Sequence, residues 1–321
     1  MQALICAGDG RVELAEAPLP QIPDGWARVR VLRAGVCGTD LELARGYKGG
    51  YRGILGHEFV GVVEASPADP AWEGARVVGE INVACGGCPA CRRGDRTHCA
   101  HRRVLGILDL DGAFATHLAL PLANLHRVPA AVPDADAVFT EPLAAAVEIL
   151  EQVHVRPSWQ ALVLGDGKLG LLCAQVLHRA GCACTLVGRH PAKLALAAAW
   201  GIPTLQADGP LPDDADLVVE CTGRPEGLAL ALRIVRPRGT IVLKSTFAGP
   251  TTFPATDLAV NEVTLVGSRC GPFAPALRLL ATGQVQVAPL LAATYPLAEA
   301  GAAFAHAGRP GVLKVQIVCT P

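Results

Sequence analysis

The chain has 321 residues, of which 51% are hydrophobic and 18% charged, and its formal net charge is −1. This length is typical of about two domains. The near-neutral charge excludes the strongly basic surface that binds nucleic acid or anionic membranes, so neither is expected as a partner. No basic segment followed by an apolar run opens the sequence, so we expect no signal peptide. The 12 cysteines are then expected to be reduced, in a cytoplasmic protein.

The first 140 or so residues contain short β-rich runs separated by Gly, Pro and Asp. This punctuation predicts an irregular, mostly antiparallel β domain. The expected strands cover residues 27–32, 59–64, 75–83 and 113–120.

From about residue 143 to 268, strand-like and helix-like runs alternate, which predicts βαβ units and a doubly wound parallel sheet. The expected strands are 161–164, 183–187, 216–220, 240–244 and 263–267, and the expected helices are 169–180, 192–200 and 227–235. After residue 270 we expect one helix, 274–281, and a final strand, 312–318. The sequence therefore predicts an α/β protein: a nucleotide-binding domain of residues 143–269 inserted in a β domain of residues 1–142 and 270–321.

A glycine-rich segment joins the first predicted strand and helix of the nucleotide-binding domain. Its residues are Gly165, Asp166, Gly167, Lys168, Leu169 and Gly170. The glycines have the G-x-G-x-x-G spacing, in which the first allows a tight turn, the second lets the backbone approach a pyrophosphate, and the third lets the helix pack on the strand. The position between strand and helix favours a dinucleotide site over an ordinary glycine-rich turn.

The end of the next predicted strand indicates which dinucleotide binds. An acidic residue there would bind the ribose 2′-hydroxyl of NAD, but this chain has Gly188 followed by Arg189. An arginine can pair with a 2′-phosphate, so NADP is favoured over NAD. An exposed Arg189 without a cofactor role is the alternative.

Four cysteines fall within 15 residues in the pattern C-x2-C-x2-C-x7-C. They are Cys85, Cys88, Cys91 and Cys99. Such closely spaced thiolates are typical of a structural zinc site, which has no open coordination position and performs no chemistry. Reduced structural cysteines or disulfides are the alternative.

A second set of zinc ligands is dispersed over Cys37, His57 and Glu141. Three protein ligands leave one coordination position for water or substrate, as catalytic zinc requires. Asp40 is placed to orient the His57 ring. Taken singly, each residue could instead belong to the core or to the first turn of a helix.

Together these features resemble the zinc-containing medium-chain dehydrogenase/reductase superfamily. The motifs that match, in order, are Cys37-Gly38-Thr39-Asp40, Gly56-His57-Glu58-x-x-Gly61, the four cysteines, Asp111-Gly112-Ala113-Phe114-Ala115, Glu141-Pro142-Leu143, Gly165 to Gly170 and Glu220-x-Thr222-Gly223. The resemblance implies a GroES-like catalytic domain, a Rossmann domain and an active site in the cleft between them. It also implies that Cys37 and His57 bind catalytic zinc, that Thr39 relays the substrate proton, and that Thr222 belongs to the cofactor site.

The residue at the position of the third catalytic-zinc ligand narrows the resemblance to particular branches of the superfamily. Glu141 stands where the alcohol dehydrogenases proper have cysteine, and the Glu-Pro-Leu form is similar to the sorbitol, polyol, sugar and threonine dehydrogenase branches. Glu58 is a secondary candidate, because the corresponding carboxylate in the family can approach zinc. Glu42 departs from the family, since it stands where many relatives have a relay histidine.

The sequence thus predicts a zinc-dependent oxidoreductase that transfers a hydride between a secondary alcohol and NADP or NAD, with zinc polarising the substrate oxygen. The expected substrate is a polyol, sugar or amino alcohol, and the expected assembly is a homodimer or homotetramer. A zinc-independent quinone reductase of the same superfamily would lack the ligands and cysteines found here. The alternative from another class is a dinucleotide-binding regulatory or redox-sensing protein without turnover.

Overall fold

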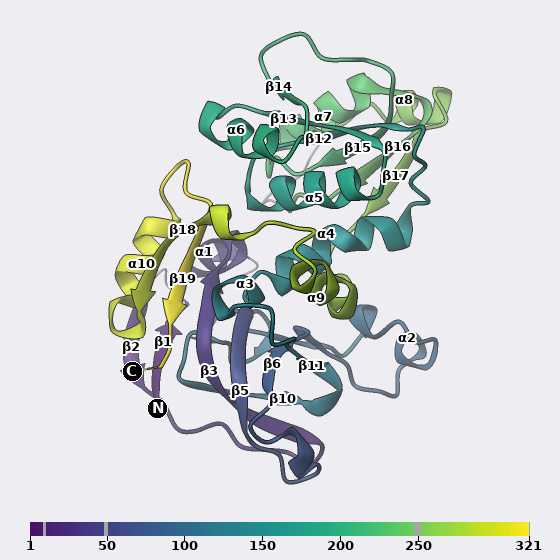
Figure 1. The fold of residues 1–321 in the computed structure, drawn as a ribbon. Helices are drawn as coiled ribbons and strands as arrows, with labels where there is room; N and C mark the ends of the chain where they lie inside the picture. Colours follow the sequence, from purple (N-terminus) through teal and green to yellow (C-terminus); the bar gives the residue numbers. More distant parts are fainter. Residues whose placement is uncertain (9–10, 48–50, 247–251, 321) are drawn as a thin grey trace. The chain divides into compact units, whose positions relative to one another are not determined.

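The computed structural model describes residues 1–8, 11–47, 51–246 and 252–320. The chain forms two compact units (Figure 1). The first unit comprises Met1–Glu141, Ala276–Thr282 and Gln286–Pro321. The second comprises Pro142–Pro275 and Gly283–Val285.

The described residues of the first unit form three sheets. The largest has the order β11-β6-β5-β3-β19-β18, with β10 also paired to β3: β11 (Leu125–Arg127), β6 (Arg76–Gly79), β5 (Glu58–Ala65), β3 (Trp26–Val36), β19 (Lys314–Val318), β18 (Leu291–Pro296) and β10 (His117–Pro121). The two smaller sheets are β2-β1-β4 and β7-β8-β9: β2 (Val12–Glu16), β1 (Gln2–Cys6), β4 (Gly53–Ile54), β7 (Asn82–Val83), β8 (Arg103–Leu105) and β9 (Asp109–Leu110). Most pairings are antiparallel, as predicted, whereas β18–β19 and β8–β9 are parallel.

The last strand of the chain lies beside one of its first. β19 pairs antiparallel with β3, so that Val315 lies opposite Val36 (Figure 1). Along the first half of β3, buried residues such as Ala27, Val29 and Val31 alternate with more exposed ones. This period of two gives the strand one face that packs into the core. Residues from both ends of the sequence therefore belong to the same sheet.

The second unit is built on a parallel sheet with the order β14-β13-β12-β15-β16-β17. Its strands are β14 (Thr204–Gln206), β13 (Ala183–Gly188), β12 (Gln160–Leu164), β15 (Ala215–Glu220), β16 (Val235–Leu243) and β17 (Thr264–Gly267). The near-continuous apolar runs of β12 and β15 suit strands whose two faces are both covered. The strand order reverses between β12 and β15, and ligands of such sheets bind beyond the carboxyl ends of strands at that point.

The helices are mostly short. They are α1 (Gly38–Ala44), α2 (Pro89–Arg92), α3 (Asp134–Ala137), α4 (Thr140–Gln152), α5 (Lys168–Arg179), α6 (Pro191–Ala199), α7 (Pro225–Ile234), α8 (Ala255–Val260), α9 (Phe273–Ala281) and α10 (Ala300–Ala307). In the second unit α5 packs against β12 and β13, and α7 packs against β15 and β16. No helix in the described part of the chain combines the length and apolar character needed to cross a membrane.

Two predicted strands were too long. The segment 75–83 forms two short strands, β6 and β7, and in the segment 113–120 only the residues from His117 onward form a strand. The cause in the second case is a loop contact, because Ala113 and Phe114 donate backbone hydrogen bonds to Gly56 and Leu55 instead of to a strand partner. The prediction for the end of the chain also lacked β18 and α10.

Candidate metal and cofactor sites

The four cysteines of the C-x2-C-x2-C-x7-C motif come together between β7 and β8. Their sulfur atoms lie within 4.8 Å of one another. The sulfur of Cys88 is 3.5 Å from that of Cys91 and 3.8 Å from that of Cys99. Zinc–sulfur bonds of about 2.3 Å in tetrahedral geometry place sulfur atoms about 3.8 Å apart. The four residues therefore fit one zinc ion, and all 12 cysteines of the chain are free thiols.

The backbone around these cysteines favours thiolates. Hydrogen bonds from the backbone of Cys91 and Ala100 lower the pKa of Cys88 to about 6, whereas desolvation and the neighbouring thiols raise the pKa of Cys91 to about 11. The backbone N–H groups of Cys85 and His101 point to the sulfur of Cys99, at 3.3 and 3.4 Å. Metal binding requires the thiolate form, which the backbone hydrogen bonds favour at Cys88.

A second group of possible ligands lies where α1 begins and β5 begins. Cys37 precedes α1, and His57 precedes Glu58, the first residue of β5. The sulfur of Cys37, a ring nitrogen of His57 and a carboxylate oxygen of Glu58 lie within 4.8 Å of one another. His57 and Glu58 are buried. A thiol, an imidazole and a carboxylate are the donor types that catalytic zinc uses.

Asp40 holds this group together. Its carboxylate accepts hydrogen bonds from the backbone N–H groups of Cys37, at 2.8 Å, and Gly56, at 3.3 Å, and it lies 3.1 Å from Nδ1 of His57. The contact with Nδ1 leaves Nε2 as the free nitrogen of the ring for a metal. Burial disfavours the charged imidazole, but Asp40 and Cys37 outweigh burial and raise the pKa of His57 well above its usual value. The predicted orienting contact of Asp40 is confirmed.

Glu58 is part of a buried ion pair that the sequence did not indicate. One carboxylate oxygen, Oε2, pairs with Nζ of Lys314, and both side chains are fully buried. Burial opposes the charged ammonium group, but the negative charge of Glu58 outweighs it and raises the pKa of Lys314. Gly35 makes room for the pair, since a Cβ at Gly35 would lie 2.5 Å from Oε2 of Glu58.

The other oxygen of Glu58 provides a test of the fit to a metal. Among the residues that the structure describes, Oε1 of Glu58 has no hydrogen-bond partner although it is buried. A buried carboxylate oxygen without a partner is costly, and a cation held by Cys37 and His57 would provide one. The residues present therefore fit zinc.

Glu141 and Thr39 lie near this group, whereas Glu42 points to solvent. Glu141 is in the first turn of α4, outside the group of ligand atoms within 4.8 Å, and its charge contributes to the raised pKa of Lys314. The hydroxyl of Thr39 is 3.9 Å from the sulfur of Cys37. Glu42 is half exposed and pairs with Arg45 at 2.9 Å.

The glycine-rich segment lies between β12 and α5 at the centre of the parallel sheet. A Cβ at Gly170 would collide with the carbonyl oxygen of Gly165, and Gly165 itself has φ +111°. In contrast, a Cβ at Gly167 would meet nothing within 4 Å. Gly165 and Gly170 are therefore required by the turn, while Gly167 keeps an open space before the first residue of α5. A phosphate group can approach the backbone in such a space.

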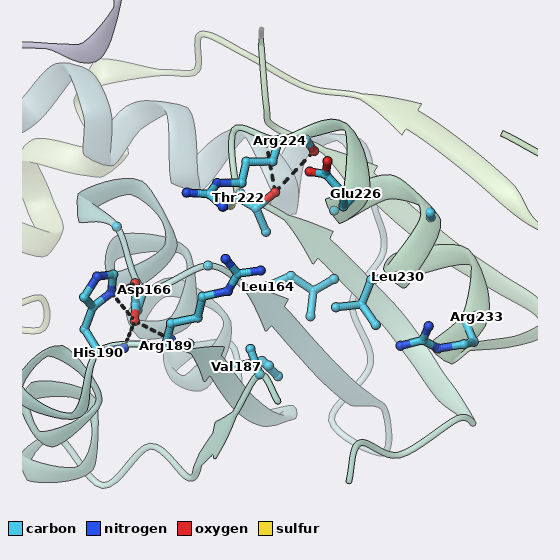
Figure 2. A pocket seen from close by; sticks show the side chains of 17 residues that line it. Leu164, Asp166, Val187, Arg189, His190, Thr222, Arg224, Glu226, Leu230 and Arg233 are labelled. Carbon is cyan, nitrogen blue, oxygen red and sulfur yellow. Dashed lines mark hydrogen bonds and ion pairs between the residues drawn. The ribbon is translucent and has the colours of Figure 1, made fainter. Parts of the chain in front are cut away.

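A cavity of about 490 Å³ adjoins this segment, and Figure 2 shows its lining. Gly165, Asp166, Gly167, Gly188 and Thr222 line the cavity, as does Arg189, whose side chain points into it (Figure 2). Three arginines contribute positive charge to the lining: Arg189, Arg224 and Arg233. The hydroxyl of Thr222 is held by Glu220 at 2.5 Å. Lys168 and Leu169 begin α5 but are not among the lining residues.

Asp166 has a role that the glycine-rich motif did not indicate. Its carboxylate accepts hydrogen bonds from the backbone N–H groups of Arg189 and His190, both at 2.7 Å, and lies 3.0 Å from Nδ1 of His190 (Figure 2). Burial favours the neutral carboxyl, but the hydrogen bonds from His190 and Arg189 outweigh it, so the pKa of Asp166 is lowered. A carboxylate therefore does lie at the end of β13, supplied by the preceding loop. No local pattern pairs residues of two successive loops, which is why it was missed.

The second unit has the parallel sheet of dinucleotide-binding domains, and the first unit has two groups of possible zinc ligands. Together these features define a class of proteins, the zinc-dependent dehydrogenases. The chain matches the family model of the alcohol dehydrogenase GroES-like domain over residues 23–130 and that of zinc-binding dehydrogenases over residues 169–282. It is 30% identical to the sorbitol dehydrogenase of Halalkalibacterium halodurans over 344 residues, which covers 100% of this chain and 99% of that protein. The chain belongs to the zinc-containing alcohol dehydrogenase family of medium-chain dehydrogenases.

Solved structures support the same assignment. A zinc-binding dehydrogenase from Sinorhizobium meliloti 1021 bound to NADP is 27% identical, with a TM-score of 0.91, 99% of this chain covered and 98% of that one. An alcohol dehydrogenase from Escherichia coli CFT073 in complex with NADH is 25% identical, with a TM-score of 0.91 and 99% of both chains covered. The predicted fold, a GroES-like domain and a Rossmann domain, is confirmed. The protein is a zinc-dependent oxidoreductase with a nicotinamide cofactor, and the regulatory alternative is not favoured.

Proposed function

We propose that this protein oxidises a secondary alcohol of the polyol class, or reduces the corresponding ketone, with NADP favoured over NAD. The observation that carries the proposal has two parts: ligand atoms of Cys37, His57 and Glu58 lie within 4.8 Å of one another, and Oε1 of Glu58 is buried without a hydrogen-bond partner among the described residues. The resemblance to a sorbitol dehydrogenase over the whole chain supports a polyol substrate. We further propose a cytoplasmic homodimer or homotetramer, with residues 1–142 and 270–321 as the catalytic domain and 143–269 as the cofactor domain.

Cys37 and His57 would hold the catalytic zinc together with one carboxylate. The motif assigns the carboxylate to Glu141, whereas the geometry brings Glu58 to the pair. Cys85, Cys88, Cys91 and Cys99 would hold a structural zinc. When bound, zinc supplies Lewis acidity toward the substrate oxygen, and the nicotinamide ring supplies the hydride acceptor.

The residues around the zinc ligands position and move protons. Asp40 fixes the orientation of the His57 ring through Nδ1. Oγ1 of Thr39, 3.9 Å from the sulfur of Cys37, would accept the hydroxyl proton of a substrate held beside that sulfur while giving up its own proton toward the cofactor ribose and solvent. The half-exposed side chain of Glu42 pairs with Arg45, so we propose no relay role for it.

In the cofactor domain, Gly167 would admit the pyrophosphate and Arg189 would contact a 2′-phosphate. The supporting observations are the open space at Gly167 and the three arginines of the cavity. An arginine forms a two-point contact with phosphate, which suits it to this role.

The test combines zinc analysis with turnover of sorbitol, other polyols and simple secondary alcohols, each with NADP and with NAD. We expect two zinc ions per chain and faster reduction of NADP. Cys37→Ser and His57→Gln should each retain one zinc ion and lose turnover, whereas Cys91→Ser should lose the other zinc ion.

Comparison of Glu58→Gln with Glu141→Gln assigns the third ligand, because only the variant of the true ligand loses the catalytic zinc. A protein that binds zinc and dinucleotide but reduces neither cofactor with any polyol would contradict the proposed substrate class. Full turnover of Cys37→Ser would contradict the proposed metal site.

A further inference from the structure

The carboxylate of Asp166 occupies the end of β13, where the sequence itself has no acid. Two backbone N–H groups, those of Arg189 and His190, point at Oδ2 of Asp166 from 2.7 Å. The ring of His190 contacts the same carboxylate at 3.0 Å. Without Asp166, these donors would face the cavity and could bind an anion. Asp166 therefore fills an anion-binding position with a charge of the protein.

Gly188 and Asp166 exclude a second side chain from this position. A Cβ at Gly188 would lie 2.6 Å from both Cβ and Oδ2 of Asp166. An acidic residue on β13 and the carboxylate from the loop therefore cannot be present together. Although residue 188 is a glycine, this end of the sheet still has a negative charge, because Asp166 brings a carboxylate to it.

The hydrogen bonds of Asp166 decide what this carboxylate can do for a ligand. The protein itself provides three donors to its oxygens, and only 6% of the residue is exposed. It is thus a poor acceptor for a ribose hydroxyl, which would have to displace one of those donors. Its negative charge remains, and that charge repels a phosphate placed at the same end of β13.

The arginines of the cavity act in the opposite direction. Arg189, Arg224 and Arg233 line the same cavity, and the side chain of Arg189 points into it (Figure 2). Discrimination between a ribose with and without a 2′-phosphate then depends on attraction by the arginines and on repulsion by two carboxylates: Asp166 at the end of β13, and Glu226, which also lines the cavity.

We propose that Asp166 is a specificity-determining residue that limits the affinity of the cavity for a 2′-phosphorylated adenine nucleotide and contributes little to the affinity for the unphosphorylated one. This inference rests on the proposed assignment of the cavity to the cofactor. It makes the cofactor preference depend on a residue of the glycine-rich loop as well as on the end of β13.

The test is Asp166→Asn, which preserves the shape of the side chain and one acceptor oxygen but removes the charge. Calorimetric titration of the full-length protein with adenosine 2′,5′-bisphosphate and with adenosine 5′-monophosphate needs neither zinc nor turnover. We expect the variant to bind the bisphosphate on the order of tenfold more tightly, as loss of one nearby like charge implies, and to bind the monophosphate within about twofold of wild type.

The control is Asp216→Asn on β15, another carboxylate that accepts a backbone hydrogen bond, from Gln160 at 2.8 Å, and pairs with an arginine, Arg236, at 2.8 Å. Asp216 does not line the cavity, so its variant should leave the ratio of the two dissociation constants unchanged. Asp166→Ser, which also frees the two N–H groups, provides a second variant and should shift the ratio in the same direction as Asp166→Asn.

The ratio of dissociation constants separates the possible results. A wild-type ratio in both Asp166 variants, including the case where both ligands weaken equally, would overturn the proposal and leave Asp166 a purely structural residue. Failure of the wild-type protein to bind either nucleotide would instead contradict the assignment of the cavity, and with it the proposed cofactor site.

Discussion

At the scale of single residues, the candidate zinc site depends on how buried charges are balanced. Glu58 and Lys314 are fully buried, and Gly35 provides the space in which they meet. A buried ion pair adds little stability compared with apolar residues, but removing one partner leaves the other charge without compensation. Lys314 therefore allows a carboxylate to lie beside Cys37 and His57 even before a metal binds.

Lys314→Met should lower the free energy of unfolding of the metal-free protein by about 3–5 kcal/mol, because Glu58 would then be buried without a counter-charge. Urea unfolding followed by circular dichroism measures the change. The matched control is Arg45→Met, which breaks the exposed pair with Glu42, where the side chains are 64% and 51% exposed. That variant should change the stability by no more than about 0.5 kcal/mol. Equal stability of Lys314→Met and wild type would show that the pair is not needed.

The sequence identified some of these residues and not others, for a physical reason. The four cysteines stand in one short motif whose spacing suits a single metal ion, whereas Cys37 and His57 were indicated by the resemblance of their separate motifs to a known family. Lys314 is 256 residues from Glu58 and belongs to no motif. Its function arises only when β19 pairs with β3, which no local pattern specifies.

At the scale of elements, the turn from β12 to α5 shapes the proposed cofactor site. Two of its glycines meet different surroundings: Gly170 faces the backbone of Gly165, whereas Gly167 faces open space. The motif predicted this division of roles, because turn geometry and helix packing are local properties. The ends of less regular elements were predicted less well. In α10 six of eight residues are alanine or glycine, which give little contrast between apolar and polar faces.

Gly167→Ala and Gly170→Ala should therefore have different effects. A methyl group at Gly167 contacts nothing, so the free energy of unfolding should change by less than about 1 kcal/mol, while NADP binds on the order of tenfold or more weakly. A methyl group at Gly170 collides with the backbone, so stability should fall by about 1–3 kcal/mol. Urea unfolding and fluorescence titration with NADPH measure the two effects. Unchanged NADPH affinity in Gly167→Ala would contradict the phosphate role of this loop.

At the scale of the whole molecule, the two proposed functions, metal binding and cofactor binding, are divided between the two units. Both groups of possible metal ligands belong to the first unit, and the glycine-rich loop with its cavity belongs to the second. A bound ligand stabilises the structure that holds it in proportion to the logarithm of its concentration over its dissociation constant. Metal and cofactor should thus protect different parts of the chain.

Removal of zinc with a chelator should increase amide hydrogen exchange in β7 and β8, which flank the four cysteines, by about tenfold or more. The strands β12 and β13 should exchange as before. Addition of NADP should slow exchange in the segment 165–170 and leave exchange in β7 and β8 unchanged. Mass spectrometry of peptic peptides resolves these segments. Equal effects of chelation on β7 and β12 would show that the two units do not respond separately.

The pairing of β19 with β3 has a consequence for the order in which the protein is made. Residues 1–141 of the first unit emerge from the ribosome well before β18 and β19 are synthesised, and these two strands complete the same sheet. Until then one edge of β3 has unpaired backbone groups, which favour aggregation, and Glu58 lacks Lys314. The second unit is almost continuous in sequence and can fold during this interval. The nascent first unit therefore keeps an open sheet edge at β3 until β19 has been synthesised.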